Sequence, residues 1–211
     1  MVVHYYAIEG PIGAGKSTLA RLLAAELGYE LLLERPEDNP FLPRFYRDPA
    51  SGALPAQLAF LLQRAGQAEQ LQQPDLFARG CVADFLFDKD RLFAELTLAH
   101  ADYELYLKVF ERLAWNVPPP QRVIYLTAPP ELLLERIARR GREYEVSIDA
   151  DYLLRLSAAY RRYFGAYTQA PVIEVDTARF DFLRSPDDFR ELLSALREAG
   201  AGLRLPRDHL L

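Results

Sequence analysis

Apolar residues recur along the chain with two alternating periods, one typical of strands and one typical of helices. Short apolar segments of strand length occupy residues 2–8, 29–34, 80–84, 123–126 and 172–175. Between them, apolar residues recur every three or four positions and predict helices over 19–27, 58–71, 92–113 (as two helices), 133–137, 152–163 and 186–200. Strands that alternate with helices favour a parallel sheet of five strands covered on both faces, because parallel neighbours need long crossovers.

Glycine and proline mark several boundaries between these segments. Gly28 is expected to cap the helix that follows the first strand, and Ser185 followed by Pro186 is typical of a helix start. Residues 35–55 are rich in proline and predict an irregular stretch that holds one short helix, at 41–46. Residues 201–211 carry no recognisable pattern.

The size and composition indicate one soluble globular domain over residues 1–211. The chain has 211 residues, of which 50% are hydrophobic and 26% are charged, so it can bury one core, and neither disorder nor a membrane span is expected. No apolar N-terminal segment follows a basic one. We therefore expect no secretory signal and a cytoplasmic location.

The charge and the metal-binding residue types exclude further classes of protein. Lysine and arginine number 25 against 30 acidic residues, and a net charge of -5 has the wrong sign for binding the many phosphates of a nucleic acid. Cys81 is the only cysteine, and the three histidines stand at no ligand-like spacing. An internal disulfide is excluded, and no structural metal is expected.

One segment carries a specific chemical signal, between the first strand and the first helix. Its sequence fits the phosphate-loop pattern Gly-x-x-x-x-Gly-Lys-Ser. Backbone amides and the helix start would bind phosphates, Lys16 would reach the β and γ phosphates, and Ser17 would ligate Mg²⁺. The predicted ATP-binding residues of the loop are Gly10, Gly13, Ala14, Gly15, Lys16, Ser17 and Thr18. A nucleoside triphosphate and Mg²⁺ follow from this motif, but the phosphoryl acceptor does not.

From Tyr5 to about Asp176 the chain resembles the deoxynucleoside kinase family, on this loop and on further motifs. Glu34 stands at the end of the second strand, where the family has a catalytic glutamate, although Arg35 separates it from Pro36. The resemblance implies a P-loop kinase fold with sheet order 2-3-1-4-5, ATP as donor, and transfer to the 5'-hydroxyl of a deoxynucleoside. It also implies a homodimer formed through long helices. Three aromatic residues either serve in that contact or belong to the core: Tyr103, Tyr106 and Phe110.

The resemblance also implies the residues that bind the acceptor. Gln57 matches a glutamine that hydrogen-bonds the base. Arg64 and Asp90 match a pair found in the branch that takes purine deoxynucleosides or deoxycytidine. Tyr46 matches a tyrosine that contacts the sugar 3'-hydroxyl, and Phe60, Phe85 and Phe87 are candidates for packing on the base. Each of these residues also has an ordinary structural interpretation, such as a surface glutamine, a plain salt bridge or a core phenylalanine.

An arginine-rich segment at about 136–147 resembles the family's lid. Arg136, Arg140 and Arg142 would surround the transferring phosphoryl group, and the resemblance implies that Glu145 reaches the 3'-hydroxyl. Arg136, Arg139 and Arg140 share one helix face at offsets of three and four, which is also typical of a solvated basic helix end. Residues 180–182 either contact the donor's adenine or form an ordinary packed loop.

The chain departs from the family pattern after the third strand. The family usually carries Glu-Arg-Ser there, whereas this chain has Asp84-Phe85-Leu86, which keeps the acid and loses the arginine. Asp84 is predicted to share Mg²⁺ with Ser17, and Lys89 is the nearest candidate to replace the arginine.

We therefore predict Glu34 as the general base, with Lys16, Arg140 and Arg142 as the other catalytic residues. An ion pair between Glu34 and the adjacent Arg35 is the alternative for the carboxylate. The alternatives for the whole protein are a nucleoside monophosphate kinase, a non-catalytic nucleotide-binding protein, and a kinase for another small molecule.

Overall fold

The computed structural model describes residues 4–72, 79–113, 117–198 and 202–206, which form an α/β fold around one parallel sheet. Its strands lie in the order β2-β3-β1-β4-β5-β6, and every pair is parallel. Their bounds are β1 Tyr5–Glu9, β2 Glu30–Leu32, β3 Cys81–Ala83, β4 Arg122–Thr127, β5 Val172–Asp176 and β6 Leu203–Leu205. The five predicted strands and their order are confirmed.

The sixth strand, β6, was not expected from the sequence. Leu203–Leu205 adds to the sheet edge beside β5, in register with Ile173, Glu174 and Val175. Three residues are too few to display a period, so pairing with β5, rather than local sequence, defines this strand.

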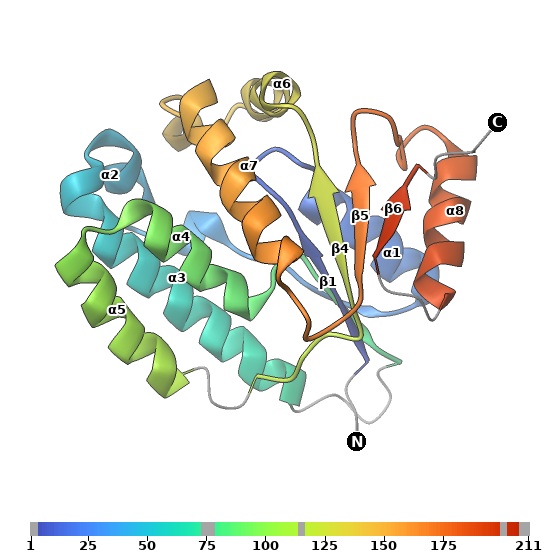
Figure 1. The fold of residues 1–211 in the computed structure, drawn as a ribbon, viewed down its shortest axis with the longest axis horizontal. Coiled ribbons are helices and arrows are strands. Elements are labelled where there is room, and N and C mark those ends of the chain that lie inside the picture. The colour runs from blue at the N-terminus through green and yellow to red at the C-terminus, as the bar shows by residue number, and fades with distance from the viewer. Residues whose placement is uncertain (1–3, 73–78, 114–116, 199–201, 207–211) are drawn as a thin grey trace.

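The helices cover both faces of the sheet (Figure 1). In this view α7 crosses in front of the strands and α1 lies behind them, while α2, α3, α4 and α5 gather beside the β2 edge. The α-helices are α1 Lys16–Leu27, α2 Leu42–Arg47, α3 Pro49–Gln72, α4 Asp90–Thr97, α5 His100–Leu113, α6 Pro130–Arg140, α7 Ala150–Gly165 and α8 Pro186–Arg197. In the described part of the chain, none of these helices is long and apolar enough to cross a membrane.

Helix α3 begins earlier than the sequence predicts. It starts at Pro49 and continues through Pro55, so the expected irregular stretch to residue 55 is wrong. A proline in the first turn loses no helical hydrogen bond, and Pro55 forgoes only one. Gly52 lets α3 approach α2, since a Cβ there would lie 2.5 Å from the Cα of Phe45.

The predicted helix boundaries at Gly28 and Ser185 are confirmed. Gly28 ends α1 in the left-handed conformation with φ +64°, and the Ser185 side chain accepts a hydrogen bond from the Asp188 N–H at the start of α8. Both caps depend on a single local residue, which is why they are recognisable from sequence.

The carboxyl ends of the parallel strands lie at one edge of the sheet, and the predicted site residues follow them there. Buried apolar residues of β1, β4 and β5 pack against α1 and α7 in one cluster. Its members come from separate elements along the chain, the first being Ile8 and the last Leu205. Tyr106 and Phe110 pack within the protomer against α3, so these two residues belong to the core. The arrowheads of β4 and β5 in Figure 1 point to the edge where α6 lies.

Candidate active site

The loop between β1 and α1 has the form expected of a phosphate loop. Gly15 precedes the first residue of α1, Lys16, with φ +101°, and the first turn of that helix contains no acidic residue. Gly10 has φ +149°, and a Cβ there would lie 2.4 Å from the carbonyl oxygen of Leu126 in β4. Only glycine fits this approach. The loop therefore presents its backbone and a helix N-terminus to an anion.

Lys16 lies over this loop. Its Nζ donates hydrogen bonds to the carbonyl oxygens of Gly10 at 2.8 Å and Pro11 at 3.2 Å. Burial, followed by the nearby ammonium of Lys89, lowers the pKa of Lys16 to about 8. These weak backbone contacts are ones that a phosphate oxygen can replace.

Ser17 and Asp84 meet directly beside the loop, although 67 residues separate them in the chain. The Ser17 hydroxyl donates to Asp84 Oδ2 at 2.5 Å, and the Glu34 N–H donates to Asp84 Oδ1 at 2.7 Å. Burial and then the negative charge of Glu34 raise the pKa of Asp84. A hydroxyl and an undercompensated carboxylate are hard oxygen donors of the kind that Mg²⁺ prefers, so the two residues fit a magnesium site. Among the described residues, no group of three or more histidines, cysteines and acids is placed to hold a metal by itself.

Glu34 follows β2 and points into a cluster of cations. Arg64 Nε donates to Glu34 Oε1 at 2.7 Å, and Lys89 Nζ lies 3.4 Å from the same oxygen. Burial would raise the pKa of Glu34, but the charges of Arg64, Lys89 and Lys16 outweigh it and lower the pKa to about 2. The alternative ion pair with Arg35 is wrong, because Arg35 lies on the surface, 3.9 Å from Asp38.

Of the three residues expected at the base, Arg64 and Asp90 form an ion pair, and Gln57 has a separate partner. Arg64 also donates to Asp90, and Asp90 accepts a second hydrogen bond from the Tyr106 hydroxyl at 2.7 Å. Gln57 is 4% exposed, so it is not a surface glutamine, and its amide donates to Thr97 Oγ1 at 3.2 Å. Arg64 and Asp90 do not form an isolated salt bridge, because Arg64 also pairs with the carboxylate of Glu34.

The predicted lid arginines divide into two groups. Arg140 donates to both carboxylate oxygens of Glu145, at 2.7 Å each, and Arg142 lies 3.8 Å from Glu145. Arg136 instead donates to the hydroxyl and the carbonyl oxygen of Thr177, at 2.7 and 2.8 Å. Gly141, which ends α6 in the left-handed conformation with φ +69°, lies between Arg140 and Arg142.

Tyr46 and Glu145 lie on the same side of this site. The Tyr46 ring stacks on that of Tyr144, with centroids 6.1 Å apart, and Glu145 is 5% exposed. Burial is the main cause of a Tyr46 pKa well above its usual value.

Two clefts meet at the phosphate loop. The first is lined by the loop, Phe182 and all four arginines from Arg136 to Arg142, and we call it the donor cleft. The second contains Glu34, Tyr46, Gln57, Arg64, Asp84 and Glu145 among its lining residues, and we call it the acceptor cleft. Lys16, Ser17, Arg140 and Arg142 line both. Phosphoryl transfer between two bound molecules requires their reacting groups to lie close together, and two clefts that share lining residues allow this.

The aromatic residues of the acceptor cleft differ in part from those expected. Phe60 lines it, with the Arg64 guanidinium 5.1 Å from its ring centroid. Phe85 and Phe87 are each 2% exposed and belong to the hydrophobic core. Phe93, in α4, lines the cleft and was missed, because its spacing with Leu92 and Leu96 is that of a core position.

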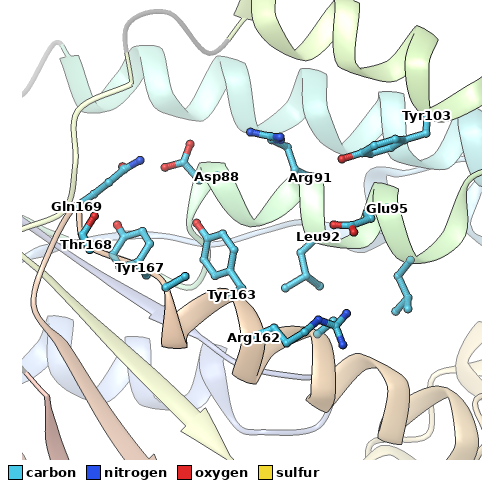
Figure 2. A pocket seen from close by; sticks show the side chains of 13 residues that line it. Asp88, Arg91, Leu92, Glu95, Tyr103, Arg162, Tyr163, Tyr167, Thr168 and Gln169 are labelled. Carbon is cyan, nitrogen blue, oxygen red and sulfur yellow. The ribbon is translucent and has the colours of Figure 1, made fainter. Parts of the chain in front are cut away.

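A third depression lies away from this chemistry, between α4 and α7 (Figure 2). Tyr163 and Tyr167 line it on one side and Asp88 and Arg91 on the other. No site residue predicted from the sequence lines this depression.

Glu9 is a further charged residue of the site that the sequence did not single out. It is fully buried at the end of β1, and its carboxylate accepts from the backbone N–H of Leu86 at 2.6 Å. Lys89 Nζ lies 3.1 Å from the same Glu9 oxygen. A charged residue at the end of an apolar strand, directly before Gly10, was the signal available.

The parallel sheet, the phosphate loop after its first strand and the arginine segment at the end of α6 define a P-loop kinase. Residues 6–199 match the family described as "Deoxynucleoside kinase", and the chain belongs to that family. The protein is therefore a phosphotransferase of nucleotide salvage that uses ATP and acts on deoxynucleosides.

Individual relatives agree with this assignment. A deoxyguanosine kinase of Bacillus subtilis (strain 168) is 34% identical over 199 residues, which cover 92% of this chain and 96% of that protein. A deoxyadenosine kinase of Dictyostelium discoideum is 32% identical, covering 92% and 80%. The solved structure of a deoxyadenosine kinase from M. mycoides with bound dATP has a TM-score of 0.79 at 24% identity. It covers 92% of this chain and 100% of that chain, which shows the shared fold.

Proposed function

We propose that the protein transfers the γ-phosphoryl group of ATP to the 5'-hydroxyl of a purine deoxynucleoside, deoxyguanosine or deoxyadenosine, with deoxycytidine as the next acceptor. The observation that supports this choice of base is the Arg64 guanidinium, which Asp90 and Glu34 fix by ion pairs and which lines the same cleft as the buried Gln57. A fixed guanidinium and an amide together offer donors and an acceptor to the edge of a base. The relatives named above are kinases of the two purine deoxynucleosides.

In the donor cleft, the phosphates of ATP would lie on the loop amides and displace Lys16 from Gly10 and Pro11. Ser17 and Asp84 would hold Mg²⁺, which supplies charge neutralisation to the β and γ phosphates when bound. Arg140 and Arg142 line both clefts, so they are placed to follow the phosphoryl group from donor to acceptor. Arg136 would contribute at the outer part of the donor cleft, where Thr177 holds it.

In the acceptor cleft, Glu34 would accept the proton of the 5'-hydroxyl. A carboxylate with a pKa of about 2 is ionised at every physiological pH and is always ready to accept a hydrogen bond. It is a weak base in the resting enzyme, so it acts by orienting the hydroxyl and taking the proton late, as a loose transition state allows. Tyr46 and Glu145 would contact the 3'-hydroxyl of the sugar.

A nucleoside monophosphate as acceptor fits this cleft less well. A second phosphate needs a cation that no carboxylate has already neutralised, as a partner for its charge. Arg64 is bonded to Glu34 and Asp90, and Lys89 is paired with Glu9 and Glu34.

The test of the function is ADP release with ATP and Mg²⁺ over a panel of deoxynucleosides and their monophosphates. We expect turnover with purine deoxynucleosides, then with deoxycytidine. Turnover with the monophosphates alone would overturn the proposal.

Replacing Glu34 with glutamine tests the base. Glu34→Gln is expected to lower kcat about 10³-fold, because the amide cannot take the proton, and to leave the KM for the deoxynucleoside within about threefold. Glu37→Gln, an exposed change three residues away, is the matched control and should leave kcat unchanged. A kcat for Glu34→Gln equal to that of the control would remove the assignment.

The magnesium site is tested by its carboxylate. Asp84→Asn is expected to raise the Mg²⁺ concentration for half-maximal turnover about tenfold, since an amide oxygen carries no charge to attract the ion. Titration of Mg²⁺ at fixed total ATP measures this, and Asp187→Asn on the surface of α8 is the control. An unchanged Mg²⁺ requirement in Asp84→Asn would place the ion elsewhere.

The homodimer and the cytoplasmic location stay predictions. Tyr106 and Phe110 are buried inside the protomer, so these two residues would not carry the contact between subunits. Light scattering of the purified protein measures its oligomeric state directly.

A further inference from the structure

Glu9 and Lys89 form a buried ion pair that the proposed roles of ATP, Mg²⁺ and Glu34 do not use. Glu9 is 0% exposed and Lys89 is 2% exposed. Burying two charges costs several kcal/mol per ion before their attraction offsets it, so a pair in this position calls for an explanation.

The contacts of Glu9 fix it completely. Besides Leu86 and Lys89 on one oxygen, the other oxygen accepts from the Gly10 N–H at 3.2 Å and from the Tyr160 hydroxyl at 3.0 Å. All four partners are donors, which is the environment of an ionised carboxylate. Burial raises the pKa of Glu9, and the ammonium of Lys89 works against that rise. Glu9 thus ties the start of the phosphate loop to the segment after β3.

Lys89 reaches from this anchor to the reacting region. It ends the short 3-10 helix Phe87–Lys89, and its Nζ lies between Glu9 at 3.1 Å and Glu34 at 3.4 Å. It lines the acceptor cleft together with Lys16 and Glu34, and its Nζ is 5.6 Å from the centroid of the Phe93 ring. The ammonium therefore stands at the carboxylate that receives the acceptor's hydroxyl.

Phe85 stands where the family pattern places an arginine, and its burial in the core leaves that position without a charge in the cleft. Lys89, four residues later, delivers a cation to Glu34 from the first turn beyond the strand. A lysine at position 89 can thus supply Glu34 with the positive charge that an arginine at position 85 supplies in the family pattern.

We propose that Lys89, anchored by Glu9, is the positioning residue that holds Glu34 toward the 5'-hydroxyl and supplies the positive charge that the missing arginine would have given. The inference rests on the proposed function, since it needs Glu34 to act on that hydroxyl. A purely structural ion pair is the competing explanation, in which Lys89 only neutralises Glu9.

Three variants of the full-length protein distinguish the two. Lys89→Met removes the ammonium and leaves an unbranched, uncharged side chain that is one atom shorter. The double variant Glu9→Gln, Lys89→Met removes both charges, so that neither is left buried alone. Lys108→Met, on the exposed face of α5, is the matched control. Each is assayed for kcat, for the KM of the deoxynucleoside and for its thermal unfolding midpoint.

We expect Lys89→Met to lower kcat by about 100-fold or more, with the KM of the deoxynucleoside within about threefold of wild type. The double variant should regain most of any lost thermal stability while kcat stays low. If Lys89→Met does not fold, the double variant alone provides the kcat.

A double variant with kcat within about threefold of wild type, or a Lys89→Met variant with unchanged kcat, would overturn the inference and leave the proposed function standing. Failure of the wild-type protein to turn over any deoxynucleoside would instead overturn the proposed function, and this inference with it.

Discussion

The donor and acceptor clefts share a wall but are built in opposite ways. The phosphate loop is continuous in sequence, from Gly10 to Thr18, and its residues from Gly13 onward line the donor cleft, where they offer backbone and one helix end to an anion. The acceptor cleft gathers side chains from the phosphate loop, from the segments that follow β2, β3 and α6, and from helices α2, α3, α4, α6 and α7. A contiguous loop can be recognised from its sequence motif, whereas a site assembled from distant segments depends on how the helices pack.

The electrostatics of the two regions differ in the same way. In the donor cleft, the first turn of α1 contains no acidic side chain, so the positive N-terminal end of this helix is not neutralised. The acceptor cleft holds a chain of alternating buried charges, from Glu9 through Lys89, Glu34 and Arg64 to Asp90. The donor cleft thus keeps positive charge available for a charged ligand, whereas the charges of the acceptor cleft neutralise one another, as suits the uncharged nucleoside that we propose as acceptor.

The largest effect should follow from removing the charge of the donor cleft. Lys16→Met is expected to lower kcat/KM for ATP about 10³-fold, because no other side chain of the loop neutralises the β and γ phosphates. Steady-state kinetics give this value, and calorimetry should show deoxynucleoside affinity unchanged, with Lys108→Met as control. If deoxynucleoside binding weakened as much as ATP use, the separation of the two clefts would be wrong.

A smaller effect is expected on the acceptor side. Gln57→Leu should lower kcat/KM for purine deoxynucleosides about 10- to 100-fold, since one paired amide is worth about 1–3 kcal/mol, while the KM for ATP stays constant. Gln70→Leu, on the exposed face of the same helix, should change neither value. Equal losses for both variants would show that Gln57 does not contact the base.

The smallest effect tests the support behind the acceptor cleft. Tyr106→Phe removes the hydroxyl that donates to Asp90, so the free energy of unfolding should fall by about 1 kcal/mol in a urea titration. Tyr103→Phe, in the neighbouring turn of α5 and beside the depression of Figure 2, is the control. A stability loss confined to Tyr103→Phe would contradict the hydrogen bond to Asp90.

Much of the fold could be predicted because its signals are local. The five strands, the caps at Gly28 and Ser185 and the phosphate loop each depend on a few adjacent residues. The start of α3 could not, since Pro49 and Pro55 resemble helix breakers until Gly52 is seen packed against Phe45. Strand β6 depends on its pairing with β5.

The candidate site shows the same division. Arg64 and Asp90 were singled out as a pair and Glu34 by itself, and the structure joins all three in one ion-paired chain. The sequence left Phe85 and Phe87 as candidates for either the base or the core, and they lie in the core, whereas Phe93 lines the cleft. Periodicity identifies a helix face but does not distinguish the core from a cleft that the same face borders.

The sequence by itself determined the parallel α/β fold, the phosphate loop and the family, because each is encoded by period, spacing or contiguous motif. Only the tertiary structure decided which cations reach Glu34: Arg35, its neighbour in the chain, lies on the surface, while Arg64 and Lys89 come from distant turns. The Glu9–Lys89 pair belongs to the same category. Coulomb interactions depend on distance in space and on burial, and neither follows from separation along the chain.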